Sequence, residues 1–262
     1  MEWRVSLRTT FDDVADLYDR ARPAYPDAVF DDLATLTGLP EGGRVLELGS
    51  GTGQATLPLA ERGYRIIGVE LGERLAAIAQ RKLIDFPNVQ LAIGPFEEWD
   101  HGDVRFDAFV AFTSFHWLDP TSRYQRVARM LRDNGSLAIV ETSHVRRERG
   151  NSFWVEVQQD YDAVVPSDDN RPPPHPDEVG DLSEEIDASG LFHQAAVRRH
   201  LFDVMYNADE YVAVLGTYSG HIALDPGVRE ELLARIRRRV ETQPSRTVTK
   251  TYLATLNVAQ LR

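Results

Sequence analysis

The segment RVLELGSGTG, residues 44–53, decides the fold of this chain. Its first five residues form a short, mostly apolar run that predicts a buried strand. Gly49, Gly51 and Gly53 follow on alternate positions, and residues 54–62 have the composition of a helix. A strand that breaks into a glycine turn and then opens a helix lets the backbone approach a ligand closely and directs free amide groups at it. The segment therefore predicts a binding site for a nucleotide-like cofactor.

Strand-like and helix-like segments alternate from about residue 44 to residue 141, which predicts an α/β fold with a parallel sheet covered on both faces. The candidate strands of this part are residues 44–48, 65–70, 89–93, 106–112 and 136–140, with a turn at Asn134-Gly135 before the last. Further strands are expected at 192–205 and 247–256, and residues 11–26 contain a helical stretch that two prolines stop. Helices are also expected at 152–165, 209–215 and 228–240, the last with an apolar face of Val228, Leu232, Ile236 and Val240. Residues 166–176 form a polar, proline-rich loop with little to bury, the segment most expected to be mobile.

The composition limits the classes of function. The 262 residues suit a single domain, 1–262, in which residues 1–40 form a helical lid and residues 142–190 an insertion that completes a cap. A net charge of -12 argues against nucleic acid as a partner. The absence of cysteine excludes disulfides and thiolate metal sites, and no metal is expected. Neither a signal peptide nor a membrane-spanning run is evident, so we expect a cytoplasmic monomer or homodimer without a membrane partner.

Glycine loops occur in several nucleotide-binding classes, and the spacing separates them. The dinucleotide fingerprint G-x-G-x-x-G requires a third glycine where this chain has Gln54, which disfavours an NAD-dependent oxidoreductase. No Lys-Ser/Thr pair follows the glycines, so a phosphate-binding P-loop is also disfavoured. The second predicted strand ends in Glu70, whose carboxylate could accept both hydroxyls of a ribose. The alternative is an acid that is merely solvated at a strand end.

These motifs together resemble those of the class I S-adenosylmethionine-dependent methyltransferases. The resemblance rests on ELGSGTG, residues 47–53, followed by a strand that ends in Glu70. FDAFVAFTSFHWLD, residues 106–119, and YDRARPAYP, residues 18–26, are similar to motifs of the small-molecule, methyltransferase type 11-like branch that includes trans-aconitate methyltransferase. The resemblance implies a Rossmann-like, seven-stranded, mostly parallel sheet in the order 3-2-1-4-5-7-6 with helical lid elements. It also implies transfer of a methyl group from S-adenosyl-L-methionine to a small molecule.

The resemblance assigns cofactor roles residue by residue. The backbone of Gly49, Gly51 and Gly53 would approach the methionine and ribose parts, and Glu70 would hold the ribose. The other implied cofactor contacts are Glu47 near the aminopropyl group, Leu71, Phe96 and Glu97 around the adenine, the carbonyl of Thr113 at the methionine amine, and Arg22 at the carboxylate. Each has a structural alternative: Glu47 as a strand-end acid, Phe96 as a core residue, and Arg22 as a surface arginine.

The chemistry of the acceptor remains open between a carboxylate and a hydroxyl oxygen. Methyl transfer is an in-line displacement, and an ionised carboxylate needs no base, whereas an alcohol or phenol does. His116, after the fourth strand, is the candidate base, although His116 and Trp117 could instead form a pocket wall. Tyr18, Trp117, His144 and Tyr218 are the expected substrate residues, and Arg146, Arg147 and Arg149 could hold an acidic substrate or face solvent. A non-catalytic module that binds S-adenosylmethionine is the remaining alternative.

Overall fold

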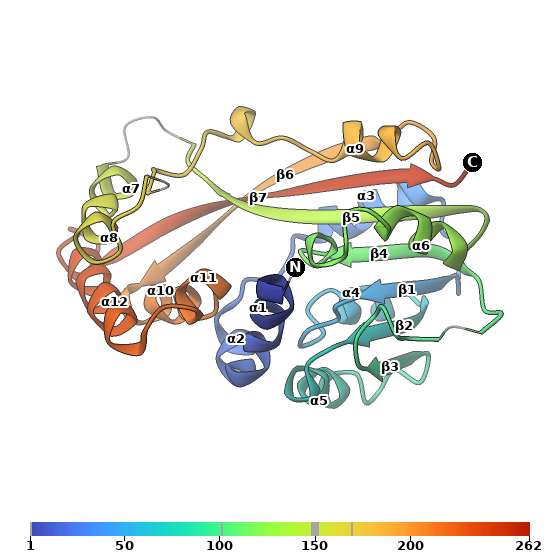
Figure 1. The fold of residues 1–262 in the computed structure, drawn as a ribbon, viewed down its shortest axis with the longest axis horizontal. Helices are drawn as coiled ribbons and strands as arrows, with labels where there is room; N and C mark the ends of the chain where they lie inside the picture. Colours follow the sequence, from blue (N-terminus) through green and yellow to red (C-terminus); the bar gives the residue numbers. More distant parts are fainter. Residues whose placement is uncertain (1, 101, 148–151, 169) are drawn as a thin grey trace.

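A seven-stranded sheet in the order β3-β2-β1-β4-β5-β7-β6 organises the fold (Figure 1). The computed structural model describes residues 2–100, 102–147, 152–168 and 170–262. Strands β1 to β5 run parallel, and β7 lies antiparallel between β5 and β6. This confirms the order and the antiparallel last strand. The strands are β1 Arg44–Leu48, β2 Arg65–Glu70, β3 Val89–Ile93, β4 Phe106–Phe112, β5 Leu131–Val145, β6 Ala196–Asn207 and β7 Thr247–Gln260.

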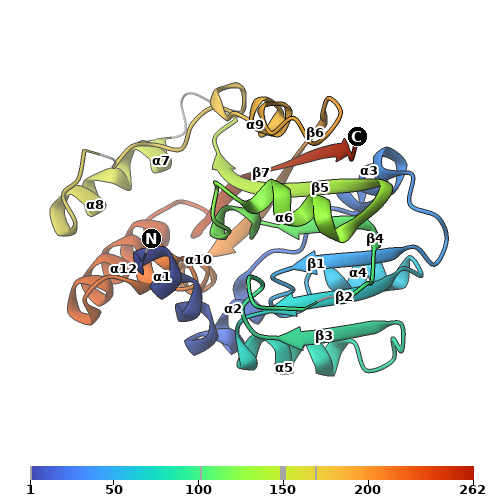
Figure 2. The same cartoon turned by 45° about the vertical axis from the view of Figure 1, so that its right-hand side comes forward.

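Helices cover both faces of the sheet and form a separate cap at one end (Figures 1 and 2). Helices α3, α4 and α5 pack on one face, and α6 and α9 on the other, together with the short helix η1. The helices are α1 Glu2–Asp13, α2 Ala15–Ala21, α3 Asp27–Thr37, α4 Thr56–Glu61, α5 Glu73–Lys82, η1 Phe115–Trp117, α6 Arg123–Met130, α7 Ser152–Glu156, α8 Gln158–Val164, η2 Pro176–Glu178, α9 Ser183–Ala188, α10 Ala208–Leu215, α11 Ser219–Ile222 and α12 Pro226–Glu241.

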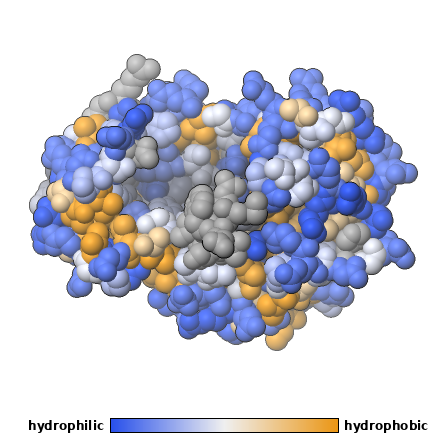
Figure 3. Space-filling view, viewed as in Figure 1, coloured by the Kyte–Doolittle hydropathy of each residue, from blue (hydrophilic) through white to orange (hydrophobic). Residues whose placement is uncertain are grey.

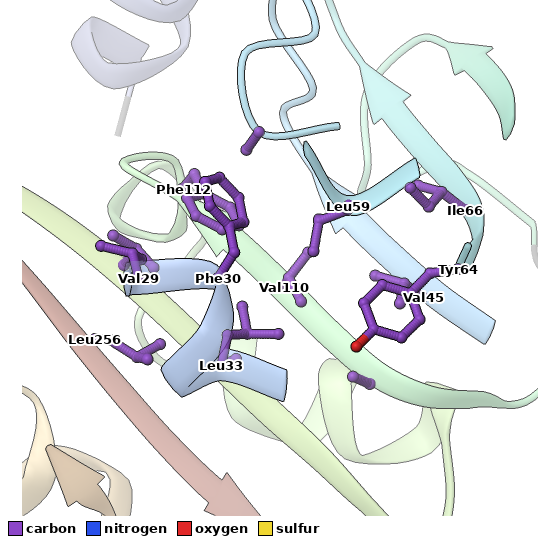
Figure 4. Packing of buried hydrophobic residues seen from close by; sticks show 14 of the residues in the cluster. Val29, Phe30, Leu33, Val45, Leu59, Tyr64, Ile66, Val110, Phe112 and Leu256 are labelled. Atoms are coloured by element: carbon purple, nitrogen blue, oxygen red, sulfur yellow. The ribbon is translucent and has the colours of Figure 1, made fainter. Parts of the chain in front are cut away.

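The alternation of side chains along β1 divides the core into two layers. Val45 faces the cluster beneath α3 and α4, whereas Leu46 faces the cluster beneath α6. In the first layer the ring of Phe30 on α3 stacks on that of Phe112 on β4, with 5.4 Å between the centroids (Figure 4). Because both faces of the central strands are buried, their sequences are continuous apolar runs, and four of the predicted strands match the observed bounds of β1 to β4.

The cap has an apolar cluster of its own, formed by α7, α8, α10 and α12 with parts of β6 and β7. Long β6 and β7 extend from the sheet to this cap (Figure 1). The predicted apolar face of the long helix is confirmed for Leu232, Ile236 and Val240, which are fully buried on α12. The sheet and the cap are therefore connected by the strands themselves.

Several predicted elements differ from the observed ones. The helical stretch expected from residue 11 is divided between α1 and α2, and β7 continues to Gln260. Strand β5 begins at Leu131, and Asn134-Gly135 forms no separate turn, because Phe106 pairs with Leu131 and Ala108 with Ser136, so the two residues lie in a bulge within the strand. Asn134 there adopts a left-handed conformation, with a φ of 59°. The helix expected over 152–165 is interrupted between α7 and α8, and β6 begins at Ala196 rather than at residue 192.

The N-terminal helices α1 and α2 lie against α5 near the carboxyl ends of the strands (Figure 2). Asp12 accepts hydrogen bonds from the backbone amides of Arg74 at 2.7 Å and Leu75 at 3.0 Å, in the first turn of α5. Ala15 packs with Leu75 and Ile78 of α5. The N-terminal segment is therefore anchored over the end of the sheet. Its role as a lid, and that of 142–190 as part of a cap, remain predictions.

On the face of the molecule in Figure 3, hydrophilic side chains predominate and apolar side chains form small groups. Within the described part of the chain, no helix combines the length and the apolar character that crossing a bilayer requires.

We expect the two-layer core to respond strongly to truncation at its centre. Ile139 on β5 is fully buried, so Ile139→Ala should lower the free energy of unfolding by about 2–5 kcal/mol. The same substitution at Ile84, which is 80% exposed, is the matched control and should change it by less than about 0.5 kcal/mol. Urea denaturation measures both, and equal losses would contradict the assignment of Ile139 to the core.

Candidate functional site

A cavity of about 390 Å³, here called the first cavity, opens at the carboxyl ends of β1, β2 and β4. The strand order reverses at this edge, because β1 lies between β2 on one side and β4 on the other, and such switch points are where open α/β sheets bind ligands. The structure brings eleven of the predicted site residues to its wall. They are Tyr18, Arg22, Gly49, Gly51, Glu70, Leu71, Phe96, Thr113, His116, Trp117 and Tyr218.

Glu70 ends β2 with its carboxylate held by backbone amides. One oxygen accepts a hydrogen bond from the amide of Gly51 at 2.7 Å, and the other from that of Gly72 at 2.8 Å. Burial raises the pKa of Glu70, and the hydrogen bonds from Gly72 and Gly51 oppose that rise. A carboxylate has about four lone-pair positions, so Glu70 can still accept a hydrogen bond from a ligand.

The glycine loop is shaped by close approaches of the backbone. Gly49 has a φ of 69°, and a Cβ atom there would lie 2.9 Å from Cβ of Ser114, which itself donates a hydrogen bond to the carbonyl of Leu48 at 2.6 Å. Gly53, with a φ of 83°, does not line the first cavity and instead lies against Ala79 of α5. Gly49 therefore brings the ends of β1 and β4 together, and Gly53 allows the loop to pack on α5.

Glu47 lies beneath the loop rather than in the wall of the first cavity. It is 1% exposed and accepts a hydrogen bond from the hydroxyl of Thr56 at 2.7 Å. Burial, opposed by the Thr56 hydrogen bond, raises the pKa of Glu47 to about 7. Its predicted contact with the aminopropyl group stays a prediction.

The far side of the first cavity is mostly apolar. Leu71 and Phe96 line it together with Val69 and Leu75, a surface suited to a flat ring. Glu97, expected beside the same ring, points to Arg8 and forms an ion pair of 2.8 Å with it. Arg8 itself lines the cavity, so Glu97 contributes to the site by orienting that arginine.

Arg22 follows α2, and its guanidinium group lies between aromatic rings. It lies 5.0 Å from the ring centroid of Tyr18 and 4.4 Å from that of Tyr218. Nε and Nη2 donate hydrogen bonds to the hydroxyl and the carbonyl oxygen of Thr217 at 2.8 and 2.9 Å. Arg22 is therefore a fixed, half-buried cation rather than a surface arginine.

A second cavity, of about 420 Å³, adjoins the first on the side of the cap. Its floor is the part of β5, β6 and β7 that extends beyond β4, where His144 pairs with Tyr252 and Tyr252 with Phe202. Side chains alternate along these strands, so Thr142 and His144 on β5, and Lys250 and Tyr252 on β7, line the same cavity. The predicted strand 136–140 stops short of this extension because Glu141–Val145 lacks a continuous apolar run.

Positive charge is concentrated in the second cavity. Arg22, Arg171 and Lys250 line it, whereas none of the lining residues that the structure describes is an aspartate or a glutamate. This contrasts with the net charge of -12 of the chain. The rest of the wall is largely aromatic, with Trp154, Tyr161, Phe202, Tyr211 and Tyr252 among its members. The cavity is therefore suited to a planar ligand of acidic character.

Two histidines line the second cavity in neutral form. Burial, and then the charge of Lys250, lower the pKa of His144 to about 2 and that of His221 to about 4. Nε2 of His221 is hydrogen bonded to the hydroxyl of Tyr161 at 2.9 Å. Nε2 of His144 is buried and has no hydrogen-bond partner among the described residues, so it is available to a ligand.

Four residues line both cavities and form their common boundary: Tyr18, Arg22, Thr113 and Tyr218. Thr113 ends β4 with a φ of 54°, a conformation that is strained for a β-branched residue. Its hydroxyl is hydrogen bonded to Tyr25 at 3.0 Å and to Thr142 at 3.3 Å. The two hydrogen bonds thus support the strained backbone of Thr113 at the boundary between the two cavities.

His116 lies on η1, in the wall of the first cavity and not of the second. It is exposed, and its ring is 4.6 Å from that of Trp117. His144 lines only the second cavity. The catalytic role of His116 stays a prediction. Arg147 pairs with Asp203 at 3.4 Å, Arg146 lines neither cavity, and Arg149 lies outside the described residues.

The sequence-based site did not include Lys250, Tyr252, Tyr161 or His221, all of which line the second cavity. One signal could have indicated Lys250, because lysine occurs only twice in this arginine-rich chain, and one of the two lies within a predicted strand. The other residues carry no local signal. They come from cap elements whose relative positions no sequence spacing predicts.

Comparison with known proteins finds a match in the central part of the chain, which supplies most of the residues that line the first cavity. Residues 45–135, from β1 to the bulge in β5, match a family model described as a methyltransferase domain. This central part of the chain is therefore similar to a methyltransferase domain. The match includes the glycine loop, Glu70 and Thr113, and it ends before the residues that extend the sheet into the cap.

Several relatives similar to this chain are also methyltransferases. An uncharacterized methyltransferase of Mycobacterium tuberculosis is 33% identical over 138 residues, which are 52% of this chain and 54% of the relative. A demethylmenaquinone methyltransferase of Tropheryma whipplei is 30% identical over 151 residues, 54% of this chain and 61% of the relative. The chain spans about half the length of the first of these relatives.

Two solved structures share the fold of this chain. A protein of Anaeromyxobacter dehalogenans assigned to the type II methyltransferases has a TM-score of 0.65 at 22% identity, covering 91% of this chain and 97% of its own. A S-adenosylmethionine-dependent methyltransferase of Geobacter sulfurreducens in complex with S-adenosyl-L-homocysteine has a TM-score of 0.52 at 16% identity, covering 92% and 93%. The Rossmann-like methyltransferase fold is thereby confirmed.

The raised pKa of Glu47 gives the domain a specific pH dependence. The folded state keeps a proton on Glu47 up to about pH 7, whereas the unfolded chain loses it near the ordinary value of 4.5. Raising the pH through this window therefore destabilises the folded protein. Glu47→Gln cannot ionise, so its stability relative to wild type should increase by roughly 2–3 kcal/mol between pH 5 and pH 8.

Urea denaturation at the two pH values measures this difference. Glu61→Gln, at an exposed position on α4, is the control and should show no comparable change between the two pH values. A Glu47→Gln variant whose stability relative to wild type is the same at pH 5 and pH 8 would contradict the assignment.

Proposed function

We propose that this chain transfers a methyl group from S-adenosyl-L-methionine to an oxygen atom, of a carboxylate or a hydroxyl group, on a small molecule held in the second cavity. The observation that carries the proposal is the carboxylate of Glu70, which faces the first cavity with both oxygens oriented by amides. A ribose offers two adjacent hydroxyl donors to such a carboxylate. The methyltransferase family match and the shared fold support the same cofactor.

The residues of the first cavity fit this cofactor. Gly49 and Gly51 present bare backbone to it, and the apolar surface of Leu71 and Phe96 suits the adenine ring. Arg22, already fixed by Thr217, is placed to pair with the carboxylate of the methionine part. When bound, S-adenosylmethionine supplies an electrophilic methyl group on its sulfonium sulfur.

The second cavity supports an acceptor that approaches from the cap. Displacement at a methyl carbon requires alignment of the acceptor oxygen and exclusion of water. The chain provides the alignment through the boundary residues Tyr18, Arg22, Thr113 and Tyr218, which contact both cavities. The aromatic and cationic wall beyond them favours planar acceptors that carry an acidic oxygen. A small-molecule acceptor and the absence of nucleic acid among the partners remain part of the proposal.

Replacing Glu70 tests the cofactor assignment. Loss of two hydrogen bonds to a charged group should weaken binding of S-adenosylhomocysteine to Glu70→Ala by about 100-fold or more. Isothermal calorimetry measures it, with Glu241→Ala at an exposed position on α12 as the control that keeps wild-type affinity.

The same experiment separates the alternatives. Wild-type protein should bind S-adenosylhomocysteine and show no heat with NADH. Binding of NADH alone, or a Glu70→Ala variant that is folded by circular dichroism and binds S-adenosylhomocysteine as tightly as wild type, would refute the proposal.

A further inference from the structure

The two lysines of this chain lie in very different surroundings. The sequence has 29 basic residues, of which only Lys82 and Lys250 are lysines. Lys82 forms a surface ion pair with Asp19, whereas Lys250 is 2% exposed and lines the second cavity. Lysine differs from arginine in that burial readily shifts its pKa, which suits it to proton chemistry. Its use at this single buried position in an arginine-rich chain is therefore informative.

Lys250 is surrounded by phenol rings rather than by carboxylates. Nζ donates a hydrogen bond to the hydroxyl of Tyr218 at 2.7 Å and lies 4.7 Å from the centroid of that ring. The ring centroids of Tyr252 and Tyr211 lie 5.0 and 5.9 Å away. Among the described residues, no aspartate or glutamate lines the cavity, and a buried cation without an anion is costly. The phenol of Tyr218 is the acidic group placed to compensate it.

A second cation acts on the same phenol. The guanidinium group of Arg22 lies 4.4 Å from the centroid of the Tyr218 ring. Burial alone would raise the pKa of Tyr218, but the charges of Lys250 and Arg22 and the hydrogen bond from Lys250 outweigh it and lower the pKa below 10.0. Burial also lowers the pKa of Lys250. Both members of the pair, the phenol of Tyr218 and the ammonium group of Lys250, therefore lose a proton more readily than the same groups do in water.

The other titratable groups of the cavity are poorer proton acceptors. His144 and His221 face it with pKa values lowered to about 2 and about 4, so their imidazoles bind a proton weakly at neutral pH. Burial, as the largest cause, raises the pKa of the remaining tyrosines that face the cavity, which are Tyr18, Tyr25, Tyr161, Tyr211 and Tyr252. Tyr218 is the tyrosine shifted toward ionisation.

Tyr218 is also at the right place, because it is one of the four boundary residues that contact both cavities. An acceptor oxygen that approaches the methyl group from the second cavity must pass this boundary. His116, the candidate base from the sequence, lines only the first cavity.

We propose that Tyr218, held by Lys250, is the general base that accepts the proton of a hydroxyl-bearing acceptor, an alcohol or a phenol, in the second cavity. This inference rests on the proposed function. The hydroxyl oxygen forms a bond to the methyl carbon, and the carbon–sulfur bond breaks with its electron pair left on sulfur. The hydroxyl proton passes to the phenolate oxygen of Tyr218, which becomes a neutral phenol. Lys250 acts through Tyr218 and is a positioning residue.

Titration of the tyrosines by their near-ultraviolet absorbance tests the pair without any acceptor. In the full-length protein, one of the nine tyrosines should ionise below the ordinary value of 10.0. Tyr218→Phe should remove this transition, and Lys250→Met should move it to higher pH. Lys82→Met removes the other lysine and should leave it unchanged. The proposal fails if no tyrosine of the wild type ionises early, or if the early transition survives in Tyr218→Phe.

Turnover distinguishes the base from an anion-binding site. With labelled S-adenosylmethionine we expect methylation of phenol or benzyl alcohol but not of benzoate. Tyr218→Phe should lower kcat by about 100-fold or more and remove the rise of activity with pH that reflects ionisation of the base. Methylation of benzoate that is lost in Lys250→Met but kept in Tyr218→Phe would overturn the proposal, since Lys250 would then bind a carboxylate directly.

Binding of S-adenosylhomocysteine separates this inference from the proposed function. Lys250 lines only the second cavity, so Lys250→Met should bind S-adenosylhomocysteine with wild-type affinity. Failure of the wild type to bind it refutes the proposed function, whatever the tyrosine titration gives. Normal binding together with an unshifted Tyr218 refutes the base alone.

Discussion

The hydrogen bonds between Glu70 and the amides of Gly51 and Gly72 are the constraint on which the first cavity depends. They join the loop after β1 to the tip of β2, two segments that are adjacent in the sheet but separated in the chain. A buried carboxylate without donors would be costly, and so would buried amides without acceptors. The carboxylate and the amides therefore stabilise one another in the buried site, and Glu70 still lines the first cavity.

Charge is distributed unevenly between the two cavities. Glu70 lines the first cavity together with the cations Arg8 and Arg22, whereas the described lining of the second has Arg22, Lys250 and, at its exposed edge, Arg171 without a carboxylate. Since the chain as a whole carries a charge of -12, this local excess of cations comes from the particular packing of the cap on the ends of the strands. Thr113, in its strained conformation, marks the point where the two environments meet.

Much of the first cavity could be predicted from sequence, and little of the second. β1, β2 and β4 are buried on both faces, so their sequences are short and mostly apolar. The extension of β5 beyond Val140 has one face in the second cavity, which gives Thr142 and His144 a mixed pattern that does not resemble a strand. The other end of β5 was missed because Asn134-Gly135, which lies in a bulge within the strand, has the sequence of a turn.

The sequence by itself determined the cofactor class, because the strand, glycine loop and acid that recognise it lie within 27 residues and their spacing is local. Only the tertiary structure decided that Tyr218 and Lys250 meet, since they are 32 residues apart and on different elements. Local spacing reports how neighbouring residues share a strand or a turn. The contact between Tyr218, just before α11, and Lys250 on β7 depends instead on antiparallel strand pairing and on the apolar cluster of the cap. Neither produces a recognisable sequence pattern at these two residues.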